Sequence, residues 1–195
     1  MFGRGDIDGD GYADLLMTSS LQEGVAHAPG RVYLVPGPTS GALPLSLLPN
    51  LLSGESMRDF AGSTGAIVSD TNGDGLDDLV VGASGADPAG SASGTIYLLH
   101  GPVPDGRTLA GADARIDGDR AGTMVGWSVA GAGDVDGDSL EDLLLGGPGE
   151  GHASESAGDQ DGDGLDDFLV AAPWADTEVG EDVGVVSLFM AVDLW

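Results

Sequence analysis

One nine-residue phrase, rich in aspartate and glycine, occurs four times in this chain of 195 residues. It reads DIDGDGYAD, DTNGDGLDD, DVDGDSLED and DQDGDGLDD, and the copies start at residues 6, 70, 134 and 159. The first three starts are evenly spaced, and this interval is the period of the repeat, whereas the last two starts are less than half a period apart. A fixed internal period is the signature of repeat proteins, in which each structural unit packs on its neighbours. The chain is predicted to fold as an array of similar units.

Short apolar runs accompany each copy of the phrase and predict strands. One run follows each phrase directly, from residues 14, 78, 142 and 167, and a second run covers 30–35, 94–99 and 184–189. These runs are too short for helices and are rich in β-branched and aromatic residues. A further run at 125–133 precedes the third phrase, with a weaker copy at 61–69, and a fourth strand is expected near 109–116. One full unit is thus a four-stranded antiparallel meander, as in a β-propeller blade.

The charge of the chain excludes several partners. There are 33 acidic residues against six basic ones, which gives a formal net charge of −27. Such a surface repels nucleic acid and anionic membranes, and it attracts cations. The most apolar stretch, 43–52, contains two prolines and is far shorter than the roughly 20 residues of a membrane helix. The chain has no cysteine, so disulfides and thiolate metal sites are excluded.

The phrase itself has the chemistry of a calcium loop. Calcium takes 6–8 oxygen ligands, and alternate carboxylates in a tight glycine-containing turn converge on one point. Positions 1, 3, 5 and 9 supply side chains, and position 7 supplies its carbonyl. The predicted ligands are Asp6, Asp8, Asp10, Tyr12 and Asp14 in the first loop; Asp70, Asn72, Asp74, Leu76 and Asp78 in the second; Asp134, Asp136, Asp138, Leu140 and Asp142 in the third; and Asp159, Asp161, Asp163, Leu165 and Asp167 in the fourth. Magnesium is the weaker candidate because it keeps its waters.

Other calcium-loop families fit the sequence less well. An EF-hand needs glutamate at position 12 and flanking helices. Position 12 is apolar in all four copies here, where the residues are Met17, Val81, Leu145 and Val170. Thrombospondin-like calcium repeats are rich in cysteine and lack the intervening strands.

The chain resembles the FG-GAP repeat family, which forms the blades of the integrin α-subunit β-propeller. The resemblance is carried by the strand at 125–133, the loop at 134–142 and the run at 143–148. Residues 30–34 and 94–98 match a later strand of the same family. The resemblance implies calcium in the hairpin loops between the first two strands of each blade. It also implies a role in adhesion or in binding a protein or glycan ligand, and an extracellular or cell-surface location. Ser139 replaces the usual loop glycine, so we expect site three to be among the weaker sites.

The whole chain, 1–195, is predicted to be one propeller segment with units at about 1–60, 61–123, 124–158 and 159–195. The short interval between the third and fourth phrases predicts that the third unit lacks its third and fourth strands. It also predicts that the fourth unit lacks most of its first strand. We therefore expect an incomplete, open array whose exposed blade faces either remain open or lead to self-association.

The sequence does not predict an enzyme. The three histidines share no motif, and residues 126–130 lack the final glycine of a nucleophile elbow. The preferred prediction is a calcium-binding, non-catalytic module for adhesion, ligand binding or structure. The alternative is a non-catalytic accessory region of a larger secreted hydrolase.

Overall fold

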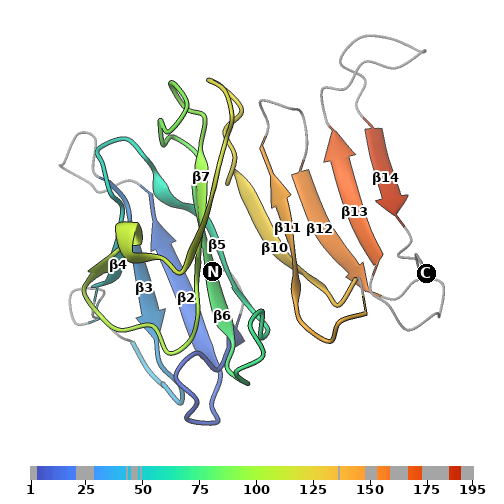
Figure 1. Cartoon of the computed structure of the whole chain (residues 1–195). Coiled ribbons are helices and arrows are strands. Elements are labelled where there is room, and N and C mark those ends of the chain that lie inside the picture. Colours follow the sequence, from blue (N-terminus) through green and yellow to red (C-terminus); the bar gives the residue numbers. More distant parts are fainter. Residues whose placement is uncertain are drawn as a thin grey trace.

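The computed structural model describes residues 4–20, 29–42, 44, 48, 50–135 and 137–147, and the backbone of three further strands at 153–158, 167–172 and 185–189. The described chain is all-β (Figure 1). Its strands are β1 (Arg4–Gly5), β2 (Asp14–Ser19), β3 (Arg31–Val35), β4 (Asn50–Ser53), β5 (Ala61–Val68), β6 (Asp78–Ala83), β7 (Thr95–Leu99), β8 (Arg107–Thr108), β9 (Ala114–Asp117), β10 (Ser128–Gly133), β11 (Asp142–Gly146), β12 (Ala153–Gly158), β13 (Asp167–Ala172) and β14 (Val185–Phe189). A 3-10 turn, η2, covers Leu109–Gly111.

The first two sheets have the predicted meander. The second sheet has the order β5-β6-β7-β9, and all its neighbours are antiparallel. The expected run at 61–69 forms β5, and the strand expected near 109–116 is β9, which follows η2. The first sheet has the order β1-β2-β3-β4-β8. Its last strand is contributed by the second unit, because β8 pairs in parallel with β4 at Leu52↔Arg107.

The third and fourth units show where the short interval falls. Among the described residues, the third sheet consists of β10 and β11, and the chain enters β12 at Ala153, soon after β11 ends at Gly146. This short connection leaves no room for two further strands of the third unit. The expectation that the fourth unit lacks most of its first strand is wrong, since β12 pairs with β13 from Ala153↔Ala171 to Gly158↔Asp167. This strand has a polar sequence of low β-propensity, and its hairpin pairing to β13 decides its conformation instead.

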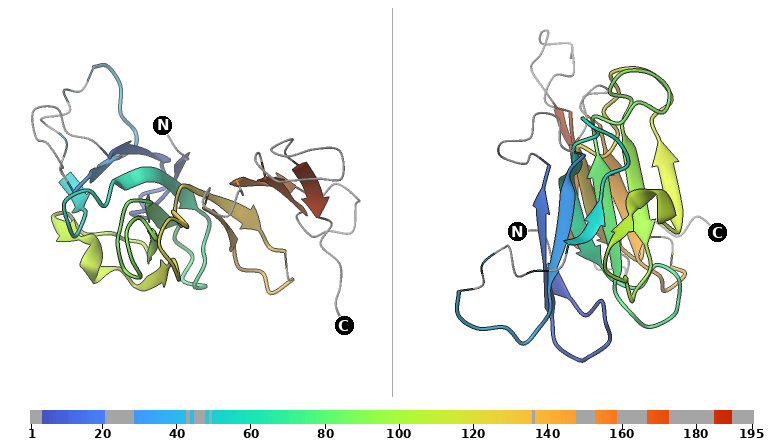
Figure 2. Two further views of the ribbon diagram at one scale, coloured as in Figure 1. Left: turned by 90° about the horizontal axis from the view of Figure 1, so that it is seen from above. Right: turned by 90° about the vertical axis from the view of Figure 1, so that its left-hand side faces the viewer.

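The core lies between successive blades. Side chains alternate along β6, so that Leu79 and Val81 belong to one apolar cluster and Val80 to another. The first cluster includes Leu16 and Leu34 of the first sheet, and the second includes Val129 of β10. Blade two is thus covered on both faces, which explains why β6 is buried along its whole length. Figure 2 shows the sheets following one another in chain order as a row, without closing into a ring.

Two glycines that are one repeat period apart join the first blade to the second and the second to the third. Gly30 bridges to Ala61, and Gly94 bridges to Val125, in each case at the start of the following blade. The amide of Val125 donates to the Ser93 carbonyl at 3.0 Å. A Cβ added at Gly94 would lie 2.2 Å from the carbonyl oxygen of Val125, so the two backbones can approach only because this residue is glycine.

Candidate metal loops

The three described loops among the predicted metal loops lie along one edge of the array, at the lower edge of Figure 1. Loop one (residues 6–13) joins β1 to β2, loop two (70–77) joins β5 to β6, and loop three (134–141) joins β10 to β11. Loop four (159–166) lies between β12 and β13, outside the described residues. The predicted ligands outside the described residues are Asp136, Asp159, Asp161, Asp163 and Leu165, and of Asp167 only the backbone is described, as the first residue of β13.

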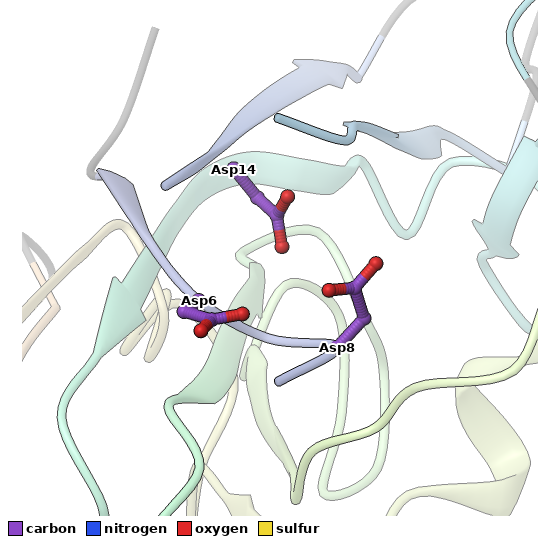
Figure 3. Close-up of side chains that lie close together, drawn as sticks. All are labelled: Asp6, Asp8 and Asp14. Atoms are coloured by element: carbon purple, nitrogen blue, oxygen red, sulfur yellow. The ribbon is translucent and has the colours of Figure 1, made fainter. Parts of the chain in front are cut away.

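In loop one, three of the predicted carboxylates converge. Oxygen atoms of Asp6, Asp8 and Asp14 lie within 4.8 Å of one another, and the three side chains face a common space (Figure 3). Asp14 is fully buried and Asp8 is exposed. Three carboxylates this close repel one another strongly unless a cation lies between them. The donor set of hard oxygen atoms fits calcium.

The backbone of loop one wraps around Asp6. Its Oδ1 accepts hydrogen bonds from the amides of Gly9 (2.8 Å) and Asp10 (3.0 Å), and its Oδ2 accepts one from Gly11 (2.8 Å). Gly9 and Gly11 have φ angles of 77° and 85°, which non-glycine residues rarely adopt. The Asp10 carboxylate accepts from the Tyr12 amide at 2.8 Å and is not part of the converging group. The Tyr12 side chain is exposed.

Loop two repeats this arrangement. Asp70 Oδ1 accepts hydrogen bonds from the amide of Gly73 at 2.6 Å, and Asp70 Oδ2 accepts one from Gly75 at 2.7 Å. These bonds, that from Gly75 first, lower the pKa of Asp70 despite the opposing effect of desolvation. The carboxylate is therefore held in its ionised form, as a metal ligand must be. The Asn72 side-chain amide donates to Asp74 Oδ2 at 3.0 Å, and the Leu76 amide donates to Asp74 Oδ1 at 2.9 Å.

One carboxylate oxygen in loop three lacks a hydrogen-bond partner among the described residues. Asp134 Oδ2 accepts a hydrogen bond from the Ser139 amide at 2.8 Å, but Asp134 Oδ1 is buried and has no hydrogen-bond partner among the described residues. A buried carboxylate oxygen without a partner is costly, and a bound cation would remove that cost. Asp138 accepts a hydrogen bond from the Leu140 amide at 2.8 Å. Asp10 and Asp74 accept the equivalent bonds from Tyr12 and Leu76 in loops one and two.

The last aspartate of each of the first three phrases also has a structural role. Asp14, Asp78 and Asp142 each accept a hydrogen bond from the amide of the second loop residue, at 3.0, 2.9 and 2.8 Å. The other oxygen of Asp14 accepts from the Gly37 amide, and that of Asp78 from the Gly101 amide, at 2.9 and 3.0 Å. Gly37 follows β3 and Gly101 follows β7, so these hydrogen bonds fix the third strand of each blade to the loop of the same blade. The sequence analysis missed them, although Gly-Pro stands at 37–38 and again one period later at 101–102.

Ser139 has a φ angle of 70°, at the position where Gly11 and Gly75 have 85° and 86°. A side chain in this region costs about 1–2 kcal/mol. The greater freedom of glycine in the unfolded chain offsets part of that cost. We therefore expect Ser139→Gly to stabilise the chain by about 0.5–1 kcal/mol, as measured by urea unfolding with and without calcium.

The reciprocal variant Gly75→Ser is the matched control for loop three. It places the same side chain at the same point of loop two, so its effect should have a similar size and the opposite sign. Destabilisation by both variants would show that the Ser139 side chain makes a favourable interaction that outweighs the backbone strain.

A buried acid outside the loops has a different character. Asp59 lies between β4 and β5, is 8% exposed, and accepts a hydrogen bond from the Ser56 amide at 2.8 Å. Desolvation raises the pKa of Asp59, with a smaller contribution from the charges of Glu55 and Asp87, and the Ser56 hydrogen bond only partly opposes this. Thr123 occupies the corresponding position one period later, so the fold does not require a charge here.

Replacing Asp59 by asparagine is expected to stabilise the chain at pH 7 by less than about 1 kcal/mol. The folded-state pKa of Asp59 exceeds its unfolded value of about 3.9, so ionised Asp59 destabilises the fold at neutral pH. That penalty vanishes below the unfolded pKa. The advantage of Asp59→Asn over the natural chain should thus shrink as the pH falls from 7 to 4 in urea-unfolding measurements. An advantage that stays constant over this range would contradict the explanation.

Comparisons with known proteins agree with this architecture. The family model for the FG-GAP repeat matches residues 61–99 and 125–158, which include loops two and three. Integrin alpha-IIb of Mus musculus is 33% identical over 150 residues, or 74% of this chain and 14% of that protein. Phosphatidylinositol-glycan-specific phospholipase D of Mus musculus is 31% identical over 151 residues, or 73% of this chain and 17% of that protein. Integrin alpha-PS2 of Drosophila melanogaster is 30% identical over 159 residues, or 72% and 11%.

This chain spans less than a fifth of the length of each of these relatives. No helix in its described part is long and apolar enough to cross a membrane. The matched repeats, the blade-like sheets and the aspartate-rich hairpin loops together show that the chain belongs to the FG-GAP repeat family of integrin α-like β-propellers.

Proposed function

We propose that this chain is a calcium-binding, non-catalytic propeller segment that serves in adhesion or in binding a protein or glycan ligand outside the cell. The observation that carries the proposal is the convergence of Asp6, Asp8 and Asp14 in a loop whose sequence recurs three more times. Calcium would supply a positive charge that holds each hairpin closed. The residues that would hold it are those at positions 1, 3, 5, 7 and 9 of each nine-residue phrase.

The similarity to integrin alpha subunits supports the ligand-binding part of the proposal and the extracellular location. The net charge of −27 supports a partner that is not a nucleic acid. Self-association through exposed blade faces stays a prediction, and light scattering at several protein concentrations would test it. A compact monomer at every concentration would contradict it.

The second candidate function is a non-catalytic accessory region of a larger hydrolase. It is supported by the similarity to phosphatidylinositol-glycan-specific phospholipase D, whose name denotes an enzyme. Both candidates exclude catalysis by this chain itself. Screens with ester, phosphoester and glycoside substrates should therefore give background rates, whereas turnover that is lost in Ser128→Ala would overturn both.

Counting bound ions by native mass spectrometry tests the calcium sites directly. We expect four calcium ions at millimolar calcium, with loop three among the weaker sites. The double variant Asp6→Asn/Asp8→Asn should bind one ion fewer, whereas Asp119→Asn, which removes one charge in an exposed loop at the other end of the blade, should bind the same number. Fewer than two bound ions in the natural chain would contradict the proposal.

A further inference from the structure

Neighbouring metal loops are joined across the blade boundary by their backbones. The amide of Asp77, the eighth residue of the loop-two phrase, donates to the Asp6 carbonyl in loop one at 3.3 Å. The amide of Glu141 donates in the same way to the Asp70 carbonyl at 3.0 Å. The second bond repeats the first after one period, so this contact is a property of the repeat. Loops two and three are therefore each in contact with the first predicted ligand of the loop before them.

The Asp77 side chain adds a second bond at the first of these boundaries. Its Oδ2 accepts a hydrogen bond from the Asp6 amide at 2.7 Å. Asp77 thus forms hydrogen bonds with both the amide and the carbonyl of Asp6. A Cβ added at the preceding residue, Gly5, would lie 2.4 Å from Asp77 Oδ2. In the next blade the corresponding Glu141 carboxylate instead accepts from the amide of Gly133, within its own blade, at 3.1 Å.

Packing supports the same connection. The Leu76 side chain of loop two lies 3.0 Å from the point where a Cβ on Gly9 of loop one would be. A change in the conformation of loop two therefore reaches loop one through Leu76 as well as through Asp77. The Asp77 carboxylate also places a further negative charge beside loop one, which repels the empty carboxylate cluster and attracts a bound cation.

We propose that Asp77 is a positioning residue that couples the two loops, so that a cation in loop two raises the affinity of loop one for calcium. The inference rests on the proposed calcium binding. Asp77 is not among the predicted ligands and acts through Asp6, whose backbone it fixes on both sides. Coupling between sites is reciprocal, so a cation in loop one strengthens binding to loop two by the same factor.

Terbium luminescence can report on loop one alone. Terbium is a hard trivalent cation that takes oxygen ligands, and a nearby tyrosine sensitises its emission. Loop one has Tyr12 at position 7, whereas the corresponding residues of the other three loops are leucines. Excitation of tyrosine in the full chain should thus report terbium in loop one, and Tyr12→Leu should remove that signal. Competition with calcium then gives the calcium affinity of loop one.

Outer contacts to metal ligands typically affect affinity by roughly 10–100-fold. We expect Asp77→Leu, which removes the acceptor and the charge, to weaken calcium binding to loop one about 10-fold. Asp77→Asn keeps an acceptor oxygen for the Asp6 amide, so it should weaken calcium binding to loop one by a smaller factor. Asp70→Asn/Asp74→Asn, which disables loop two, should weaken loop one to a similar extent as Asp77→Leu. Asp119→Asn removes one charge at the far end of the blade and should leave the affinity unchanged.

The outcomes separate the two proposals. If loop one binds calcium equally well in the natural chain, in Asp77→Leu and in the loop-two variant, the coupling is wrong and calcium binding stands. If the natural chain gives no terbium signal and binds no calcium, both proposals fail. A melting curve in chelator checks that each variant folds, and if Asp77→Leu does not fold, Asp77→Asn and the loop-two variant decide the question.

Discussion

Chelation of calcium is expected to lower the melting temperature of the full chain by about 10–20 °C. A ligand present at about 100 times its dissociation constant stabilises the fold by about 2.7 kcal/mol per site, so two such sites contribute about 5 kcal/mol. For a chain of this size, each kcal/mol corresponds to roughly 2–4 °C. Without calcium, loop one would also hold the unopposed charges of Asp6, Asp8 and Asp14, whose oxygen atoms lie within 4.8 Å of one another. Calorimetric scans with calcium and with chelator measure the difference.

Two controls separate specific binding from screening of the net charge of −27. Sodium chloride at matched ionic strength should recover only a small part of the loss, because it screens the surface without filling the loops. Magnesium should recover less than calcium does, since it retains its hydration shell. Equal recovery by all three salts would mean that the loops are acidic turns without metal sites.

The second large effect is expected from Gly94→Ala, which should destabilise the chain by about 3 kcal/mol or more. Gly94 has a φ angle of 80°, where an alanine costs about 1–2 kcal/mol. The new Cβ would also lie 2.2 and 2.3 Å from the carbonyl oxygen and the amide nitrogen of Val125. Because both are backbone atoms, the two blades would have to move apart, and the apolar contacts between them would weaken. Urea unfolding in saturating calcium measures the change.

Gly122→Ala is the matched control for the blade boundary. Gly122 has a φ angle of 83°, and a Cβ added there would meet nothing within 4 Å. Its replacement should therefore cost only the backbone contribution of about 1–2 kcal/mol. The excess destabilisation of Gly94→Ala over Gly122→Ala is then the contribution of the close approach between blades. Equal destabilisation by the two variants would show that the approach at Val125 adds nothing.

Much of the fold is encoded in short-range patterns. Short apolar runs rich in β-branched and aromatic residues predict β6 and β7, and the position of the aspartate phrase predicts each hairpin. The sequence also predicts that the third unit ends after two strands, because the interval between the third and fourth phrases is too short for four strands and their turns. These features depend on residues close together in the chain, whose conformations follow from local sterics and side-chain alternation. Part of the candidate site is predicted in the same way, since loop one brings Asp6, Asp8 and Asp14 together, whereas the carboxylate of the predicted ligand Asp10 lies outside this group.

The sequence analysis failed where a partner strand or a distant loop decides the structure. The polar stretch 153–158 forms β12 through its pairing with β13, and β8 leaves its own unit to pair with β4 of the preceding one. Neither pairing can be predicted from the pattern of side chains, because backbone hydrogen bonds to a neighbouring strand determine both.

The sequence by itself determined the repeat period, the strand type and the position of the aspartate-rich loops, since glycine and aspartate act on their own turns. Only the tertiary structure decided that Asp77 bonds Asp6, that Asp14 bonds Gly37, and that Gly94 contacts Val125. Each contact joins residues that are distant in the chain. The first and the third also join neighbouring blades. Their existence depends on how closely the packed sheets approach one another, which no local pattern specifies.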